Sequence, residues 1–198
     1  KIKMLIFLIA ICTIFYCNKE KEIKSFIDSN RTNIIDDAKN YVINITSSPL
    51  TPVDYNILIK FIPKNFEGAK SEHLDAKTVS ILNMKSSYAK AIYNFPDKSY
   101  IKINIIDIAG NKNHPAFISF SLLTMTGIEE EGINGYKKII KMGEFPGYRQ
   151  FRKSNKKTDL SLLVGDRIIL NLICVGLEQE QVDKFIKKIK LKRLSKIN

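Results

Sequence analysis

One hairpin signal constrains the fold more than any other feature of this sequence. Residues 87–95 alternate polar and apolar side chains, and residues 100–108 are again rich in β-branched side chains. Between them, Pro96-Asp97-Lys98-Ser99 indicates a turn. Two such runs joined by a short turn predict adjacent antiparallel strands.

Further strand signals surround this hairpin. Residues 160–164 and 167–175 flank Gly165-Asp166, a favoured two-residue hairpin loop. Residues 77–83 predict another strand, and residues 136–142 and 148–153 predict two more on either side of a Gly- and Pro-containing loop. Hairpins of this kind predict an antiparallel sheet, since parallel strands need long crossover connections.

Helical periodicity appears on both sides of the strand region. Residues 32–46 predict an amphipathic helix, and so do residues 178–194. Residues 51–62 predict a helix that starts with Thr51 as the N-cap and Pro52 in the first turn. The apolar run at residues 116–125 predicts a further helix.

These elements predict an α+β fold in which helices pack against a central antiparallel sheet of hairpins, as in a sandwich. We expect three regions: a signal peptide at residues 1–16, a polar tether at residues 17–31, and a single domain at residues 32–198. About 165 residues are enough to bury one core.

The N-terminal sequence predicts a targeting signal. Lys1 and Lys3 precede thirteen uncharged, mostly apolar residues, 4–16, and charged residues follow from Lys19. A helix that crosses a bilayer needs about 20 apolar residues, whereas a secretory signal needs only about 7–15. The run therefore favours an export signal.

The end of that run, Ile14-Phe15-Tyr16-Cys17, resembles the lipobox of bacterial lipoproteins, in the relaxed form found in spirochaetes. The resemblance implies that Cys17 carries a diacylglycerol, with acyl chains such as palmitate, and becomes the first residue of the mature protein. Tyr16 departs from the small residue usual beside the cysteine. An uncleaved anchor and a buried N-terminal helix remain open alternatives.

The rest of the chain shows no recognisable catalytic or cofactor-binding motif. His73 and His114 are the only histidines, and Glu129-Glu130-Glu131 lacks the loop spacing of a cation site. We expect no metal and no cofactor. Cys174 lies in an apolar run, which predicts a buried small side chain. If the protein is an enzyme, the candidates are His114 with Asp107 in an envelope hydrolase.

The formal net charge is +12, which suits an anionic partner. The lysines are spread widely, which favours dispersed solvated charges. Residues 148–153 interleave aromatic and basic side chains and predict an edge strand with solvated charges. Besides the membrane, the expected partner is an envelope protein or an anionic polymer, as for a basic surface adhesin. Nucleic acid is not expected for an exported chain.

A second resemblance rests on three stretches: Gly135-Tyr136-Lys137-Lys138, Tyr148-Arg149-Gln150-Phe151 and residues 160–167, before the C-terminal amphipathic helix. Together they resemble small bacterial envelope proteins without assigned activity, and PsbP/Mog1-like domains, which implies an α/β/α sandwich. We therefore expect a lipid-anchored, non-catalytic binding or structural module at the cell envelope.

Overall fold

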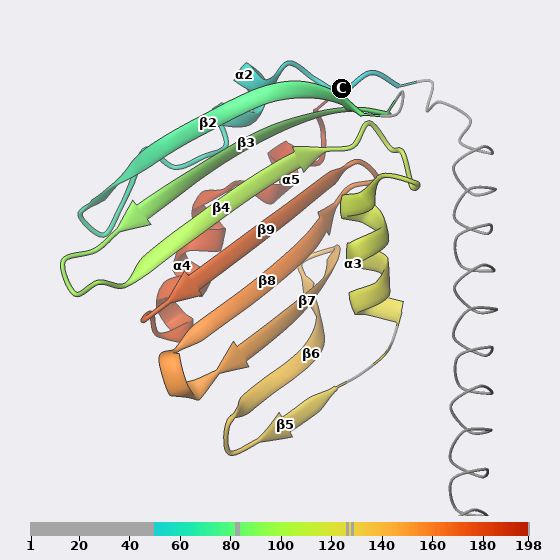
Figure 1. The fold of residues 1–198 in the computed structure, drawn as a ribbon. Coiled ribbons are helices and arrows are strands. Elements are labelled where there is room, and N and C mark those ends of the chain that lie inside the picture. Colours follow the sequence, from blue (N-terminus) through green and yellow to red (C-terminus); the bar gives the residue numbers. More distant parts are fainter. Residues whose placement is uncertain (1–49, 82–83, 126, 128, 198) are drawn as a thin grey trace, which may run out of the picture. The chain divides into compact units, whose positions relative to one another are not determined.

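Nine antiparallel strands form one open sheet in the part of the chain that the computed structural model describes, residues 50–81, 84–125, 127 and 129–197 (Figure 1). The strands are β1 (Asn65–Phe66), β2 (Ala69–Ile81), β3 (Met84–Asn94), β4 (Tyr100–Asp107), β5 (Glu130–Gly132), β6 (Gly135–Met142), β7 (Phe145–Arg152), β8 (Lys157–Val164) and β9 (Ile168–Val175). The predicted α+β class, with hairpins in a central antiparallel sheet, is confirmed.

The strand order is β1-β2-β3-β4-β9-β8-β7-β6-β5. The first four strands follow one another inward from one edge. The chain then passes through α3 (Pro115–Met125) to β5 at the opposite edge and returns strand by strand to the centre. There β9 pairs with β4, with Ile103 opposite Leu172. The two halves of the sheet are thus joined by a pair of strands far apart in sequence.

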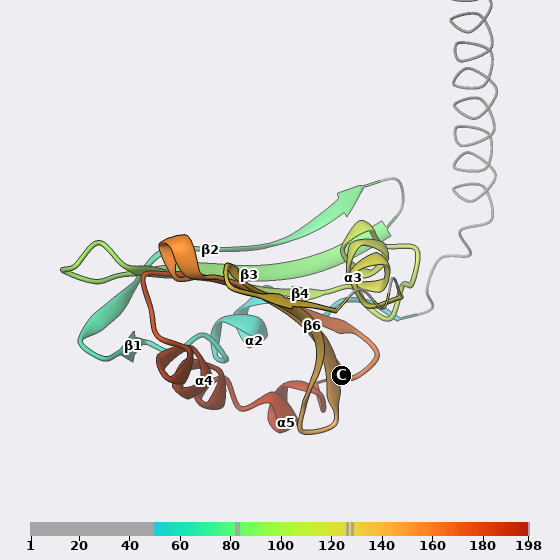
Figure 2. The same ribbon diagram turned by 90° about the horizontal axis from the view of Figure 1, so that it is seen from below.

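The helices lie unequally on the two faces of the sheet (Figure 2). On one face lie α2 (Tyr55–Ile59), α4 (Gln179–Lys188) and α5 (Leu191–Leu194), while α3 lies on the other. A short 3-10 turn, η1 (Lys153–Asn155), connects β7 to β8.

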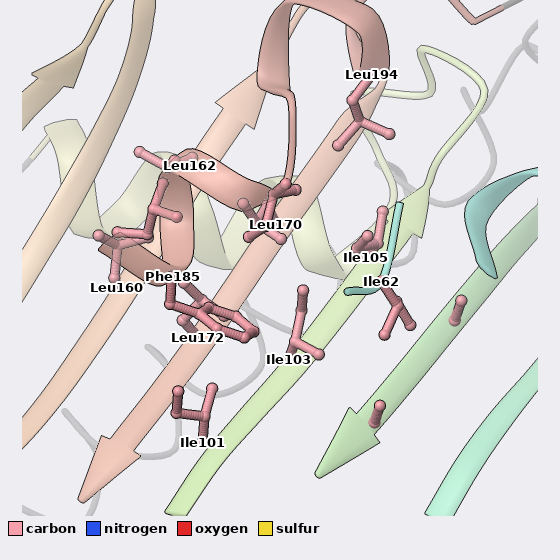
Figure 3. Packing of buried hydrophobic residues seen from close by; sticks show 14 of the residues in the cluster. Ile62, Ile101, Ile103, Ile105, Leu160, Leu162, Leu170, Leu172, Phe185 and Leu194 are labelled. Carbon is pink, nitrogen blue, oxygen red and sulfur yellow. The ribbon is translucent and has the colours of Figure 1, made fainter. Parts of the chain in front are cut away.

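The main core fills the space between the sheet and α2, α4 and α5 (Figure 3). Because side chains alternate along a strand, Ile101, Ile103 and Ile105 of β4 all point to this face and are at most 1% exposed. The ring of Phe185 on α4 meets those of Tyr93 and Phe66 edge-on, with centroids 5.1 and 5.2 Å apart. Such edge-to-face pairs add about 0.5–1.5 kcal/mol each beyond their burial.

A smaller cluster lies under α3, where Phe120 packs against Ile108 and Ile169. The helix is apolar on most sides, and it leaves Leu122 62% and Met125 82% exposed. Since α3 is the single helix on this face in the described part of the chain, much of the face stays open.

The helix predicted over residues 51–62 is shorter, because its first residues are held in other contacts. The N–H of Val53 donates to the Asp107 carboxylate, and the carbonyl of Thr51 accepts from Arg167. The helix therefore starts at Tyr55. Its N-cap is Asp54, whose carboxylate accepts a hydrogen bond from the N–H of Asn56.

The prediction of one continuous C-terminal helix over residues 178–194 is wrong. The chain breaks at Lys190, whose φ of 56° is left-handed, and α4 and α5 lie on either side. Ile189 and Leu194 are both fully buried. In an unbroken helix, residues five apart point about 140° away from each other. The break allows both side chains to reach the core.

The strand predicted at residues 77–83 is longer than expected and starts at Ala69. A bulge at His73 and Leu74 shifts its register between Glu72 and Asp75, and His73 has a φ of 49°. One extra residue inverts the period-two pattern, so the first half of the strand does not show the expected alternation.

The signal peptide (residues 1–16), the tether (residues 17–31) and the helix predicted at residues 32–46 lie outside the described residues. Contacts group residues 47–198 into one compact unit. The buried core of this unit runs from Val53 to Leu194. A chain that starts at residue 18 therefore retains the whole of this unit.

Candidate functional site

The sheet face that carries α3 is hollowed into a groove of about 840 Å³, which we call the α3-side groove. This volume lies in the usual range for ligand pockets. Its lining comes from β2, β3, β4, β7, β8 and β9, and Leu123 of α3 forms part of its wall.

Strand register places polar side chains in a row across the groove. Lys90 lies opposite Asn104, Asn104 opposite Asn171, Asn171 opposite Ser161, and Ser161 opposite Tyr148. These five residues come from five neighbouring strands, β3, β4, β9, β8 and β7. The row exists because each strand turns the same parity of side chain to this face.

A second row runs beside the first. It pairs Ile92 with Lys102, Lys102 with Ile173, Ile173 with Asp159, and Asp159 with Gln150. The two rows together give the groove alternating aliphatic and polar patches, a lining that suits a ligand with both kinds of surface.

Some polar groups of the groove already have partners. Ser161 and Asn171 are linked by a 2.7 Å hydrogen bond between their side chains. Lys90 lies 2.9 Å from Asp75, and its hydrogen bond holds the pKa of that carboxyl below the ordinary value. Asp75 is therefore charged at neutral pH and is occupied by its lysine.

Other groups keep unused hydrogen-bonding capacity. Asn104 Oδ1 is covered from solvent and has no hydrogen-bond partner within the described ranges. In those same ranges the Tyr148 hydroxyl and the Gln150 amide form no side-chain hydrogen bond, and the Lys102 ammonium lies over the Tyr100 ring. An unpaired covered oxygen costs about 1–3 kcal/mol, so a donor that reaches it is favoured.

Asp159 of β8 also lines the groove. It is held by Arg152 of β7 and Lys157 of β8, each at 3.0 Å. Because two cations share this carboxylate, Asp159 is a positioning group for its neighbours and has little capacity left for a ligand.

The proposed hydrolase pair is not brought together. Asp107 is fully buried on the face of the main core, where it accepts from Val53 N–H, Ala109 N–H and the Arg167 guanidinium. His114 lines a 330 Å³ cavity on the α3 side, which shares Lys90 and Asn104 with the groove. The carboxylate and the imidazole thus face opposite sides of the sheet.

His114 has a local structural role at the start of α3. Its Nδ1 accepts a hydrogen bond of 3.1 Å from the N–H of Ala116. Burial lowers the pKa of His114 from its ordinary 6.5, which favours the neutral ring needed for this contact. His73 lies in the β2 bulge and lines the α3-side groove.

Of Cys17 and Cys174, the structure describes only Cys174. Cys17, the predicted lipid attachment site, lies outside the described residues. Cys174 is buried in β9, and burial raises the pKa of its thiol to about 12. It is a packed core residue, as predicted from its apolar surroundings.

The segment at residues 148–153 is an inner strand, not the predicted edge strand, because β7 lies between β6 and β8. Its arginines are also paired. Arg149 binds Asp183 of α4 on the core face, and Arg152 binds Asp159. The prediction of a solvated charge is wrong for Arg149, which is only 11% exposed, whereas Arg152 keeps 44% of its side chain exposed.

The acidic run Glu129-Glu130-Glu131 lies at β5, which is the edge strand beside β6. Glu130 and Glu131 are exposed on β5, and Glu130 pairs with Lys137 at 2.9 Å. The described residues contain no group of three or more His, Cys, Asp or Glu side chains that could hold a metal ion. Within the same ranges, none of the helices combines the length and apolar character of a bilayer span.

Sequence reasoning missed the groove, although its signal is present. Asn104 and Asn171 each interrupt a run of β-branched and aliphatic residues in the strands predicted at 100–108 and 167–175. A polar amide in an otherwise apolar strand indicates a position that faces something other than the core. Their pairing across β4 and β9 requires the topology.

Comparison with known proteins adds no relative. No protein family, no curated protein and no solved structure matches this chain.

Proposed function

We propose that this chain is a non-catalytic binding module, held at a bacterial envelope membrane by lipid on Cys17, and that the α3-side groove binds a saccharide chain of the envelope. The observation that carries the proposal is the row of hydroxyl and amide groups in the groove, in which Asn104 Oδ1 and the Tyr148 hydroxyl have no hydrogen-bond partner among the described residues.

A saccharide fits this lining because each sugar ring presents hydroxyl groups that both donate and accept, beside patches of C–H. Asn104 and Gln150 offer amides, and Tyr148 offers a ring and a hydroxyl. Rotation about the Cβ–Cγ bond of Asn104 turns its unpaired oxygen toward the groove, where a sugar hydroxyl can donate to it. Lys102 provides a cation for a carboxylate on an acidic sugar.

A peptide partner is less well supported by the geometry. Extended peptides commonly bind by adding a strand to a free sheet edge. The groove lies on the sheet face, over β3, β4, β9, β8 and β7, and these strands are all paired on both sides. Main-chain pairing with a peptide is therefore absent from this site.

The membrane anchor rests on the N-terminal sequence. A single acyl chain binds a membrane only weakly, whereas the two or three chains of a lipoprotein hold it stably. A tether of residues 17–31 would leave the domain free to reach a polymer beside the membrane.

The binding proposal is tested by calorimetric titration of residues 18–198 with fragments of envelope saccharides. Asn104→Leu should abolish binding while the free energy of unfolding stays equal or rises, because the substitution removes an unpaired buried oxygen. Asn134→Leu makes the same change at an exposed residue outside the groove and should leave binding intact. Equal binding by both variants would refute the groove as the site.

The anchor is tested separately by intact mass and detergent partition of the native protein. We expect an N-terminal Cys17 with added lipid mass, and loss of both the mass and the detergent partition in Cys17→Ser. An unmodified chain that retains residues 4–16 would refute the anchor without touching the groove proposal. Hydrolytic turnover that is lost in His114→Ala would refute the non-catalytic assignment.

A further inference from the structure

A second cavity, of about 590 Å³, lies on the sheet face that carries α2, α4 and α5. It is bounded by α2 and the residues after it, by β2, and by α4, α5 and the C-terminal residues. We call it the basic pocket, because five of the side chains that line it are cationic: Lys60, Lys64, Lys188, Lys190 and Arg193.

The charge of the basic pocket is uncompensated. Among the described residues, no acidic side chain lines it. The ion pairs found among the described residues use other cations; on α4 itself, Lys184 pairs with Glu180 at 3.0 Å. Lys188 has an aromatic neighbour instead, with its Nζ 5.9 Å from the centre of the Phe66 ring. Cationic side chains are thus locally concentrated at this pocket.

The inner surface of the pocket is apolar. Ile62 and Ile189 are buried and form its floor, while Ile57, Phe61 and Ile197 are partly exposed along its walls. Cations over an apolar cavity complement a molecule with an anionic head and a hydrocarbon chain. A purely hydrophilic anion would leave these walls uncovered, and a neutral apolar ligand would leave the charges unmatched.

The backbone at Lys190 adds a second observation. With φ at 56°, this lysine occupies a left-handed conformation that costs an ordinary side chain about 1–2 kcal/mol and costs glycine almost nothing. The position between α4 and α5 would favour glycine on stability grounds. Lys190 brings a cation to the pocket in this conformation, which Lys98 and Lys156 also adopt elsewhere in the fold.

We propose that the basic pocket binds a single anionic lipid, with its phosphate at the cationic rim and its acyl chain along the apolar walls. Arg193 can hold two phosphate oxygens with its planar guanidinium, and the lysines supply point charges around it. The pocket and the α3-side groove lie on opposite faces of the sheet, so this site is independent of saccharide binding.

The test is isothermal titration of residues 18–198 with lauroyl lysophosphatidate below its critical micelle concentration. Two further ligands separate the parts of the molecule. Glycerol 3-phosphate carries the head alone, and lauroyl lysophosphatidylcholine carries the same chain with a zwitterionic head. We expect saturable binding of lysophosphatidate. Glycerol 3-phosphate and lauroyl lysophosphatidylcholine should each bind with a Kd at least about ten-fold higher.

Charge variants locate the site. Each basic residue near an anionic lipid contributes about a five-fold change in affinity, so Lys64→Gln with Arg193→Gln should weaken binding about 25-fold. Lys85→Gln with Lys141→Gln removes the same charge at exposed strand positions outside the pocket and should change binding less than about two-fold.

Lys190→Gly distinguishes a binding role from a structural one. The substitution relieves the left-handed strain, so the free energy of unfolding should stay equal or rise, while lysophosphatidate affinity falls about five-fold. Ile197→Gln should weaken lysophosphatidate and leave any residual glycerol phosphate binding unchanged.

Three results would overturn the proposal. Equal losses for the pocket pair and the control pair would mean attraction by net charge. Glycerol phosphate that binds as tightly as lysophosphatidate would mean that no acyl site exists. Undiminished lysophosphatidate affinity in Lys190→Gly would show that the Lys190 cation takes no part in binding, contrary to the role proposed for it.

Discussion

Asp107 should be a major determinant of stability, and substitution with asparagine tests this directly. The carboxylate is 0% exposed and receives four hydrogen bonds. Val53 N–H and Arg167 Nη2 donate to Oδ2, each at 2.7 Å, and Ala109 N–H and Arg167 Nε donate to Oδ1 at 2.8 and 3.0 Å. It ties the segment before α2 to the end of β4 and to the β8–β9 loop.

The magnitude follows from this geometry. In Asp107→Asn one oxygen becomes an amide nitrogen, so two of the four donors face another donor and Arg167, only 12% exposed, loses its counter-ion. Removing one partner of a buried ion pair costs about 3–5 kcal/mol. With a urea slope of about 2 kcal/mol/M, the unfolding midpoint should fall by about 1.5–2.5 M.

The assay is urea denaturation of residues 18–198, with circular dichroism as the readout. Asp97→Asn is the matched control, because Asp97 is exposed and the oxygen that accepts from Ser99 can be retained by asparagine. We expect a small midpoint change for the control. If Asp107→Asn shifts the midpoint no more than Asp97→Asn, the structural role assigned to this carboxylate is wrong.

Three other predictions concern the fold. The Cys174 thiol, whose pKa burial raises to about 12, should be inert to thiol reagents at mildly alkaline pH and react only in denaturant; rapid native-state reaction would contradict its burial. Gly135→Ala should lower the free energy of unfolding in urea by more than about 1–3 kcal/mol, because φ is 136° and an added Cβ would lie 2.0 Å from a carbonyl oxygen of β7. A Cβ added at Gly132 would meet no atom within 4 Å, so Gly132→Ala should change the free energy of unfolding only slightly. Because burial lowers the pKa of His114, its stabilising contribution should be complete above pH 6.5 and decline as the pH falls through the folded-state pKa. His114→Gln should remove this pH dependence from the free energy of unfolding, whereas His73→Gln should leave the pH dependence in place.

The fold class was accessible from sequence because its signals are local. The hairpin of β3 and β4 is encoded by alternation on both sides of one turn, within about twenty residues. The pairing of β4 with β9 has no such local signal, since the strands are separated by α3 and four other strands. Long-range pairing depends on which apolar faces fit together, and a single sequence does not specify that.

The element boundaries failed where tertiary contacts override local propensity. Thr51 and Pro52 are good helix starters, yet Asp107 and Arg167 hold the preceding backbone and move the cap to Asp54. The break at Lys190 is similar: a lysine in a left-handed conformation is unfavourable locally, and the burial of Leu194 compensates for it. In both cases the deciding interaction is a tertiary contact, which the local sequence pattern does not show.

The two proposed sites share a physical signature that makes them testable together. The unpaired oxygen of Asn104 and the left-handed backbone of Lys190 are both unfavourable for folding, and each lies in a cavity on its own face of the sheet. Residues retained against stability are expected where a protein binds a ligand. Asn104→Leu and Lys190→Gly should therefore maintain or raise the free energy of unfolding while each lowers affinity for its own ligand alone. If affinity and stability instead fall together in either variant, that residue stabilises the fold and the site built on it is refuted.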